Sequence, residues 1–166
     1  MGKALLVLDM QEAVVGTHHA AFFRYDSGLL QSVNAVIDRT DADYVVYIKN
    51  LMKKNLLSRL APVRVFDGTP EAELAKELHI VSENIFSKYT GDAFSEPALC
   101  DFFQSRQIDT AELTGADGGG CVALTALGAC RLGCRVILHT QAIGTMFVKK
   151  RDRYYEKLKK RSAVLL

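Results

Sequence analysis

The stretch LTGADGGGCVALTALGACRLGCRVIL, residues Leu113–Leu138, decides the fold. It starts within an apolar run, Asp109–Gly115, which predicts a buried strand. Three glycines follow, and Gly120–Leu132 is then rich in Ala and Leu, which predicts a helix that ends at Gly133. A second apolar run, Cys134–His139, comes directly after it. Strand, glycine loop, helix and strand together form one βα unit of a parallel sheet.

The same alternation of apolar runs and amphipathic stretches repeats about five times along the chain. The runs Lys3–Asp9 and Asp43–Ile48 are short and nearly unbroken in hydrophobicity, as strands covered on both faces must be. Ser27–Arg39 and Glu96–Arg106 space their apolar residues at helical intervals. These two segments are therefore predicted to be crossover helices.

Further segments complete the predicted order of elements. Ile80–Ser87 is a third apolar element, Tyr154–Leu158 lies in a last helix and Ser162–Leu166 is a short closing strand. Asn50–Thr69 is the least regular segment because proline and glycine interrupt it. Within it, Val63–Phe66 is either a short strand or a loop.

The composition fits one soluble domain and excludes several other classes. Of 166 residues, 49% are hydrophobic and 24% are charged, so disorder and low complexity are excluded. We expect a single domain over residues 1–166, an α/β three-layer sandwich whose mostly parallel, doubly wound sheet has about six strands.

The chain also lacks the signals of a membrane or secreted protein. No apolar run reaches the roughly 18 residues that a membrane helix needs. The first residues, MGKALLVLD, carry no signal-peptide cleavage pattern. The four cysteines have no CxxC spacing, so we expect thiols rather than a zinc site or a disulfide framework. We expect a cytoplasmic protein with no membrane partner.

The formal net charge of +2 hides a basic region near the end of the chain. Between Phe147 and Arg161 there are eight Lys or Arg residues and two acids. Such a run is compatible with binding of nucleic acid or of an anionic membrane. Its apolar residues are, however, spaced roughly as one face of a helix, so the charges fit the solvated side of the last crossover helix. We therefore expect no nucleic-acid partner.

Three chemically capable side chains follow predicted strands. Asp9 ends the first strand, Lys88 follows the third apolar element, and Cys121 opens the helix after the glycine loop. The carboxyl ends of parallel strands share one edge of the sheet, and ligands bind there. An acid at the rim of a dry core needs a partner, and Lys88 can be that partner. A base, a cation and a nucleophile are what nucleophilic acyl transfer requires.

Each of these residues also has a structural interpretation. An acid after the first strand is common in nucleotide-binding folds, a lysine is usually solvated, and a cysteine on an Ala-rich helix is often core packing. Together, the three favour a catalytic site. The helix dipole and Lys88 favour the thiolate, so the sequence predicts a lowered pKa for Cys121. Three cysteines are assigned to packing: Cys100, Cys130 and Cys134.

Three motifs stand in a familiar order. They are LLVLDMQ at Leu5–Gln11, SKYTGDAF at Ser87–Phe94, and a glycine, Gly115, six residues before the pair Cys121-Val122. With these motifs, nearly the whole chain resembles the isochorismatase-like cysteine hydrolases, the superfamily that includes nicotinamidases and N-carbamoylsarcosine amidohydrolase.

The resemblance implies that Asp9, Lys88 and Cys121 form a catalytic triad. It also implies a non-proline cis peptide at Ala116–Asp117, with the backbone amides of Asp117 and Cys121 as an oxyanion hole. In the mechanism that follows, Asp9 accepts the thiol proton, the sulfur attacks a carbonyl, and Lys88 keeps Asp9 ionised. Asp9 then protonates the departing amine, and water hydrolyses the thioester.

The chain also departs from its nicotinamidase relatives. Those enzymes hold a metal with an Asp-x-His just after the second strand, where this chain has residues 49–52, Lys-Asn-Leu-Met. We therefore expect no metal and no cofactor. We expect Gln11, His18, Phe22 and Tyr89 to line the substrate pocket. A polar loop around His18 is the alternative, and the aromatic residues near Phe22 either wall the pocket or pack against a second subunit.

The sequence thus predicts a metal-independent cysteine hydrolase that cleaves a small amide or related C–N bond through a thioester on Cys121. The alternative is a non-catalytic module on the same fold that binds a small molecule or serves in signalling. A receiver-like module is disfavoured because Asp9 is followed by Met10 and Gln11 rather than belonging to an acidic pair. The resemblance also implies a homo-oligomer, a dimer or a tetramer. The identity of the substrate stays open.

Overall fold

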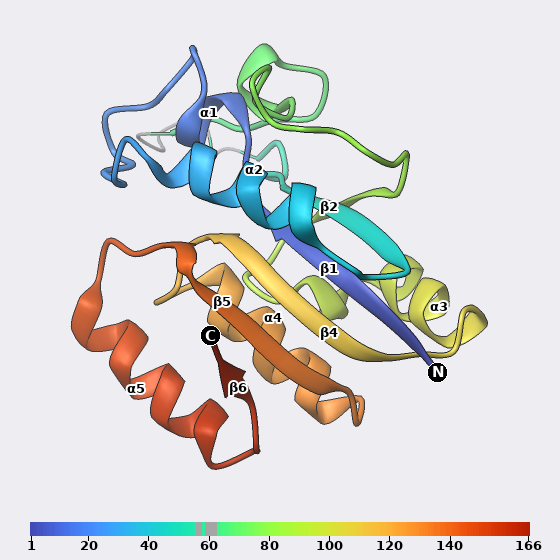
Figure 1. Cartoon of the computed structure of the whole chain (residues 1–166). Helices are drawn as coiled ribbons and strands as arrows, with labels where there is room; N and C mark the ends of the chain where they lie inside the picture. Colours follow the sequence, from blue (N-terminus) through green and yellow to red (C-terminus); the bar gives the residue numbers. More distant parts are fainter. Residues whose placement is uncertain (56–57, 59–62) are drawn as a thin grey trace.

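A parallel β-sheet forms the centre of the computed structural model, which describes residues 1–55, 58 and 63–166 (Figure 1). Six strands lie in the order β3-β2-β1-β4-β5-β6, and every neighbouring pair is parallel. The strands are β1 (Gly2–Leu8), β2 (Tyr44–Asn50), β3 (Ile85–Lys88), β4 (Ile108–Ala116), β5 (Arg135–Gly144) and β6 (Val164–Leu165). The chain adds strands on one side of β1 and then on the other, which is the doubly wound order that the sequence predicts.

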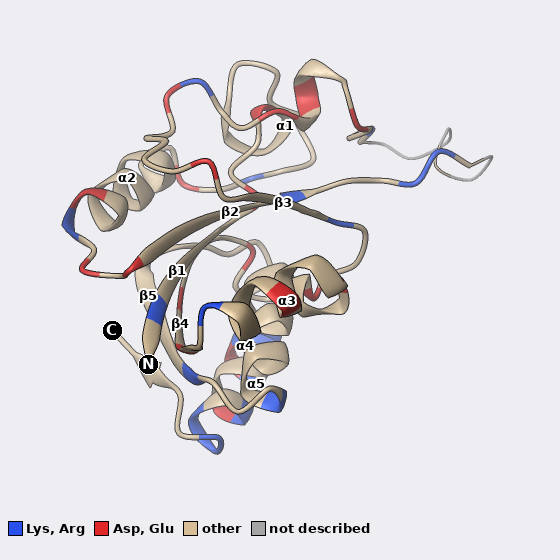
Figure 2. Ribbon diagram, turned by 90° about the vertical axis from the view of Figure 1, so that its right-hand side faces the viewer, with Lys and Arg blue, Asp and Glu red and all other residues tan. Residues whose placement is uncertain are grey.

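Helices cover both faces of the sheet. Figure 2 shows α1 and α2 on one side and α3, α4 and α5 on the other, so the fold has three layers. The helices are α1 (Glu12–Val15), α2 (Leu29–Arg39), α3 (Pro97–Ser105), α4 (Cys121–Arg131) and α5 (Val148–Lys159), with short 3-10 turns η2 (Pro70–Ala72) and η3 (Ala93–Ser95). The α/β three-layer prediction is confirmed.

Helices cover both faces of β1, and this explains why its sequence is unbroken in hydrophobicity. Leu5 and Val7 pack with α2 on one face, whereas Leu6 and Leu8 pack with α3 and α4 on the other. All four side chains have no exposed surface. Because successive side chains of a strand point to opposite faces, only a strand covered on both sides keeps every position apolar.

The third strand is shorter than the sequence predicts. Only Ile85–Lys88 pairs with β2, whereas the prediction began at Ile80. In the residues before β3, hydrogen bonds that involve side chains take the place of backbone pairing with β2. Ser82 Oγ donates to the Val45 carbonyl at 2.5 Å, and the Val81 amide donates to the Tyr47 hydroxyl at 3.0 Å. An apolar run therefore reaches this sheet edge without becoming a strand over its whole length.

The irregular segment after β2 forms no strand in its described part. Val63–Phe66 is a loop, and the Met52 amide donates to the Val65 carbonyl at 2.7 Å. Residues 56–57 and 59–62 of the predicted irregular segment lie outside the described residues.

The last helix is amphipathic, as its spacing predicts. Leu158 is fully buried, whereas most Lys and Arg residues of α5 and the turn after it are exposed (Figure 2). Within the described part of the chain, no helix has the length and apolar character that crossing a membrane requires.

Candidate active site

Asp9 and Lys88 meet at the carboxyl edge of the sheet. Asp9 directly follows β1 with a positive φ of 58°, and its amide donates to the Ile48 carbonyl at 2.9 Å. Lys88 is the last residue of β3 and has no exposed surface. Its Nζ lies 3.1 Å from Asp9 Oδ2. Because β2 separates β3 from β1, the lysine side chain reaches past the end of β2 to form this buried ion pair.

Cys121 joins this pair from the other half of the sheet. It is the first residue of α4, and the loop before it follows β4. The peptide bond between Ala116 and Asp117 at the end of β4 is cis, as the resemblance implies. Asp9 and Lys88 both act on the pKa of the Cys121 thiol, so the three predicted residues share one site.

The predicted lowering of the Cys121 pKa is wrong. Burial, together with the negative charge of Asp9, raises the pKa of this thiol to about 12, and the opposing effect of Lys88 is smaller. Burial also raises the pKa of Asp9 against the pull of Lys88. For Lys88, burial lowers the pKa, but Asp9 and Cys121 raise it by more. The resting site therefore keeps a proton on the sulfur.

One oxygen of Asp9 is left for that proton. Oδ2 faces Lys88, whereas Oδ1 is buried and has no hydrogen-bond partner among the described residues. Buried carboxylate oxygens nearly always have a partner, so an unpartnered one marks a place where a ligand or a proton is accepted. Asp9 and Cys121 line the same cavity.

Two backbone amides are also left without partners. Neither the Asp117 amide nor the Cys121 amide donates to a residue that the structure describes. Their neighbours are all engaged: Gly118 donates to the Gly144 carbonyl at 2.8 Å, and Gly120 and Val122 donate to the Asp117 carbonyl at 2.9 and 3.1 Å. Free donors therefore occur at the two positions that the resemblance assigns to the oxyanion hole.

The glycine loop is held against the start of α5. The Asp117 carboxylate accepts from the Gly119 amide at 2.6 Å and from the Met146 amide at 2.7 Å. A Cβ on Gly118 would lie 2.6 Å from Thr145 Oγ1, and one on Gly119 would lie 3.0 Å from the Phe147 carbonyl oxygen. These two glycines permit the close approach that fixes the free amides in place.

The cavity beside Cys121 is small, with a volume of about 180 Å³. Gln11 lines it as predicted, but His18, Phe22 and Tyr89 do not. Its wall is mostly apolar, with polar and charged residues at a few positions. Besides Asp9, Gln11 and Cys121, the lining includes Val14, Phe23, Tyr25, Asn50, Val65, Ala116, Asp117, Gly119, Gly120, Met146, Phe147 and Lys150.

Gln11 supports the cavity rather than offering its amide to a ligand. Its Nε2 donates to the Ala72 carbonyl at 2.8 Å, and its Oε1 accepts from the Asn50 amide at 2.8 Å. The side chain thus joins the end of β2 to η2. Gln11 is a positioning residue in this geometry.

The three other predicted pocket residues lie elsewhere for identifiable reasons. His18 Nδ1 lies 3.3 Å from a carboxylate oxygen of the buried Glu12. Phe22 is 51% exposed, and the ring that enters the cavity wall is its neighbour Phe23. Tyr89 is 43% exposed and lies outside the cavity.

Several wall residues come from two connections without periodicity, and two of them, Phe23 and Tyr25, belong to the aromatic group near Phe22 for which a pocket wall was one of the two alternatives. Phe23 and Tyr25 belong to the loop before α2, and their rings stack with centroids 6.2 Å apart. Met146 and Phe147 belong to the connection between β5 and α5. Loops carry no alternation that tells an inward side chain from an outward one.

The residues at the end of β2 do not fit a metal centre. Lys49 Nζ lies 3.4 Å from a Glu73 carboxylate oxygen, and Asn50 is held by Gln11. Across residues 1–55, 58 and 63–166, no group of three His, Cys, Asp or Glu side chains is arranged to hold a metal ion. The donor set of the metal-binding relatives is therefore not reproduced here.

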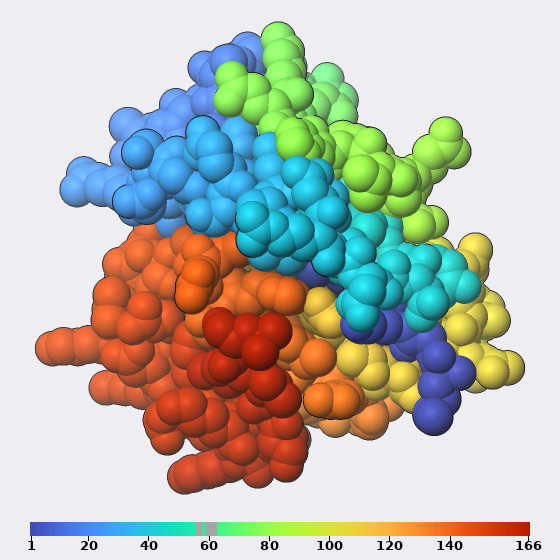
Figure 3. All heavy atoms as spheres, viewed as in Figure 1, coloured from blue at the N-terminus to red at the C-terminus, as the bar shows by residue number. Residues whose placement is uncertain are grey.

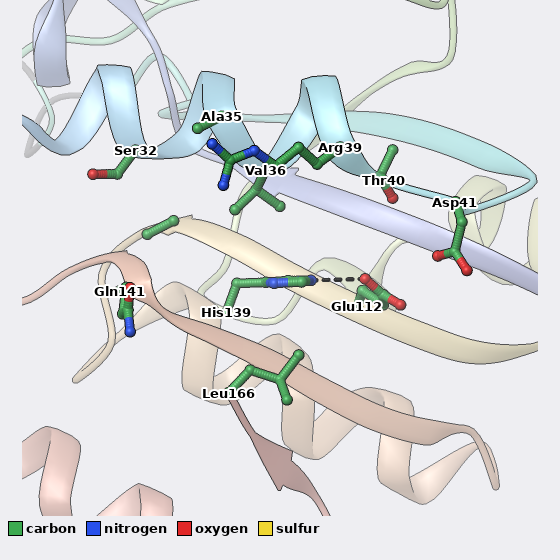
Figure 4. A pocket seen from close by; sticks show the side chains of 11 residues that line it. Ser32, Ala35, Val36, Arg39, Thr40, Asp41, Glu112, His139, Gln141 and Leu166 are labelled. Atoms are coloured by element: carbon green, nitrogen blue, oxygen red, sulfur yellow. Dashed lines mark hydrogen bonds and ion pairs between the residues drawn. The ribbon is translucent and has the colours of Figure 1, made fainter.

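A second and larger cavity lies between α2 and the strands β4 and β5, with a volume of about 530 Å³ (Figure 4). It opens on the face shown in Figure 3, between α2 and the last residues of the chain. Glu112 and His139 point toward one another in it, with Oε2 and Nε2 2.7 Å apart. The other Glu112 oxygen lies 3.3 Å from Lys3 Nζ, and Lys3 also pairs with Asp41. Both acids of this cavity are already paired.

The fold and the site together define a class: doubly wound α/β proteins with a ligand site at the carboxyl ends of their strands. The sequence matches the isochorismatase domain over residues 3–166. The chain therefore belongs to the isochorismatase family of hydrolases, which confirms the predicted family and enzyme class.

Solved structures of the same fold come from several organisms. An isochorismatase-like hydrolase from Alkaliphilus metalliredigens has a TM-score of 0.83 and 23% identity, covering 99% of this chain and 94% of that one. A pyrazinamidase/nicotinamidase from Streptococcus mutans has a TM-score of 0.84 and 20% identity, covering 99% of both chains. A pyrazinamidase of Pyrococcus horikoshii, solved in complex with zinc, has a TM-score of 0.84 and 22% identity, covering 100% and 99%. The search of curated proteins returned no match.

Proposed function

We propose that the protein is a metal-independent cysteine hydrolase that cleaves a small amide or related C–N bond through a thioester on Cys121. The observation that carries the proposal is the unmet hydrogen-bonding capacity around one small cavity. A buried oxygen of Asp9 and the amides of Asp117 and Cys121 lack partners among the described residues, and all three residues line the same cavity.

The raised pKa of Cys121 determines how the first step runs. Because the resting sulfur is protonated, Asp9 Oδ1 accepts the thiol proton as the sulfur bonds to the substrate carbonyl carbon. The carbonyl oxygen becomes an oxyanion and accepts hydrogen bonds from the Asp117 and Cys121 amides. Lys88 stabilises the negative charge of Asp9 before the transfer.

The later steps return the site to its starting state. Asp9 gives the proton to the leaving nitrogen, the C–N bond breaks and an acyl thioester stays on Cys121. Water then attacks the thioester carbonyl while Asp9 accepts a proton from it. The C–S bond breaks, and Asp9 returns the proton to the sulfur, so that the products are an amine or ammonia and an acid.

Two further observations support an amide substrate and the absence of a catalytic metal. The relatives from Streptococcus mutans and Pyrococcus horikoshii are named for hydrolysis of small amides. No three His, Cys, Asp or Glu side chains of the described residues are grouped as a metal centre needs, so no step of the mechanism is assigned to a metal.

The test measures ammonia release from a panel of nicotinamide, carbamoyl and ureido compounds by the wild type, Cys121→Ala and Cys130→Ala. Cys121→Ala should lose turnover with its thermal unfolding unchanged, and Cys130→Ala should keep it. Turnover that persists in Cys121→Ala would overturn the assignment of the nucleophile. Thermal stabilisation by a panel compound without turnover in the wild type would favour the non-catalytic binding module instead.

A further inference from the structure

The charged side chains that line the small cavity differ in whether they have a partner. Asp9 is paired with Lys88, and both oxygens of Asp117 accept backbone amides. Among the described lining residues, the remaining charged side chain is Lys150. Lys150 is therefore a cationic lining residue without an ion pair among the described residues.

Several basic residues of α5 have no ion pair with a described residue, but among them Lys150 is the one that lines the small cavity. Arg151 lies 2.7 Å from an oxygen of Asp152, and Lys159 lies 2.9 Å from an oxygen of Glu156. Lys150 makes no ion pair with a residue that the structure describes. A lining lysine without an ion pair has an ammonium whose three hydrogen-bond donors are open to a ligand.

The position of Lys150 is fixed by the same turn that forms the cavity wall. Its backbone amide donates to the Phe147 carbonyl at 3.0 Å, and Met146 and Phe147 line the cavity beside it. Phe23 and Tyr25 line the cavity as well, with their rings stacked. This lining matches a ligand whose small apolar part lies between these side chains and whose anionic group binds the lysine.

We propose that Lys150 selects the substrate, and that the amide cleaved at Cys121 belongs to a small molecule carrying a carboxylate. This inference rests on the proposed hydrolase function. The ammonium binds the carboxylate by a charge-assisted hydrogen bond, and the apolar wall limits the size of the part between carboxylate and amide. Because Lys150 is exposed on its solvent side, the attraction is partly screened and weakens as salt rises.

The experiment compares pairs of amides and of ureas in which a methyl group replaces a carboxylate. Succinamate and butyramide have equal carbon chains, and so do N-carbamoylglycine and N-ethylurea, but only the first of each pair carries a carboxylate. The measured quantity is the ratio of kcat/KM for the anionic compound to kcat/KM for its neutral partner. In Lys150→Met this ratio should fall about tenfold, and in Lys150→Glu it should fall further. The matched control is Lys149→Met, since Lys149 is exposed on the same turn and lies outside the cavity.

Binding separates this inference from the hydrolase proposal. Thermal stabilisation of Cys121→Ala by succinamate and by butyramide is measured with and without Lys150→Met. A preference for succinamate that disappears in the double variant supports the inference even if Cys121→Ala retains turnover. Equal stabilisation by both compounds, or a ratio that Lys150→Met leaves unchanged, overturns the inference even if Cys121 proves to be the nucleophile.

Discussion

The cavity at the strand ends and the cavity beside α2 contrast in size and in hydrogen bonding. The cavity between α2 and the sheet has about 530 Å³, yet its Glu112 faces His139 on one oxygen and Lys3 on the other. The cavity at the strand ends has about 180 Å³, and one buried oxygen of Asp9 has no partner in the described part of the chain. Unmet hydrogen-bonding capacity, rather than volume, distinguishes the candidate active site.

The strongest test of this contrast replaces one acid in each cavity. Asp9→Asn keeps the shape of the side chain but removes the proton acceptor, so kcat/KM should fall by at least about 10³-fold. Glu112→Gln in the larger cavity should change kcat/KM by less than about twofold. Steady-state kinetics on one amide decides, and a comparable loss in both variants would remove the distinction between the cavities.

The ion pair at the small cavity gives the next largest effect. Lys88→Met leaves Asp9 as an unpaired buried acid and should lower the free energy of unfolding by about 3–5 kcal/mol. The double variant Asp9→Leu with Lys88→Met removes both charges and should recover much of that loss. Urea unfolding measures both values. If the double variant is as unstable as the single one, packing rather than charge accounts for the role of Lys88.

The rate of alkylation of Cys121 shows whether its thiol is protonated. Since burial raises the pKa of this thiol to about 12, its reaction with iodoacetamide should rise about tenfold per pH unit between about pH 7 and 9 without levelling. Peptide mass spectrometry follows each cysteine separately. A plateau below about pH 8.5 at Cys121 alone would show that the helix dipole and Lys88 outweigh burial after all.

Glu12 is a buried acid whose oxygens both have hydrogen-bond partners, unlike those of Asp9. Its replacement gives the smallest expected effect, a change in stability at low pH. Burial raises its pKa, but hydrogen bonds from Thr17, Lys76 and His18 outweigh this effect and lower the pKa to about 2. The folded pKa lies below the unfolded value, so this group stabilises the protein above about pH 4.5 and ceases to do so as the pH falls toward 2. Glu12→Gln should flatten the fall in Tm over that range. An unchanged acid profile would exclude Glu12 as a source of the pH dependence.

The sequence predicted the edge of the sheet better than the walls of the cavity. Asp9, Lys88 and Cys121 follow strands, and parallel strands bring their carboxyl ends together whatever the loops do. A pocket wall was one of two alternatives for the aromatic residues near Phe22, and Phe23 rather than Phe22 lines the cavity. Met146 lies in a connection whose side-chain directions depend on tertiary packing, so no periodicity marked it. The pKa of Cys121 was predicted with the wrong sign because a sequence shows the helix dipole but not the depth of burial.

The boundaries of β3 were missed for a related reason. An apolar run predicts a strand, but the pairing of Ile80–Asn84 was decided by side-chain hydrogen bonds from Ser82 and Asn84 to β2. Such competition between side chains and the backbone ladder is local and specific, and hydrophobicity alone does not report it.

The buried lysine at the end of β3 also fixes how this short strand lies against its neighbour. Four residue pairs join β3 to β2, which is little to hold an outermost strand in one alignment. A shift by one residue would bring Ser87 or Tyr89 to the position of Lys88 and leave Asp9 without its counter-ion. The same ammonium that serves the chemistry thus penalises slippage, so a misaligned sheet would be both less stable and inactive.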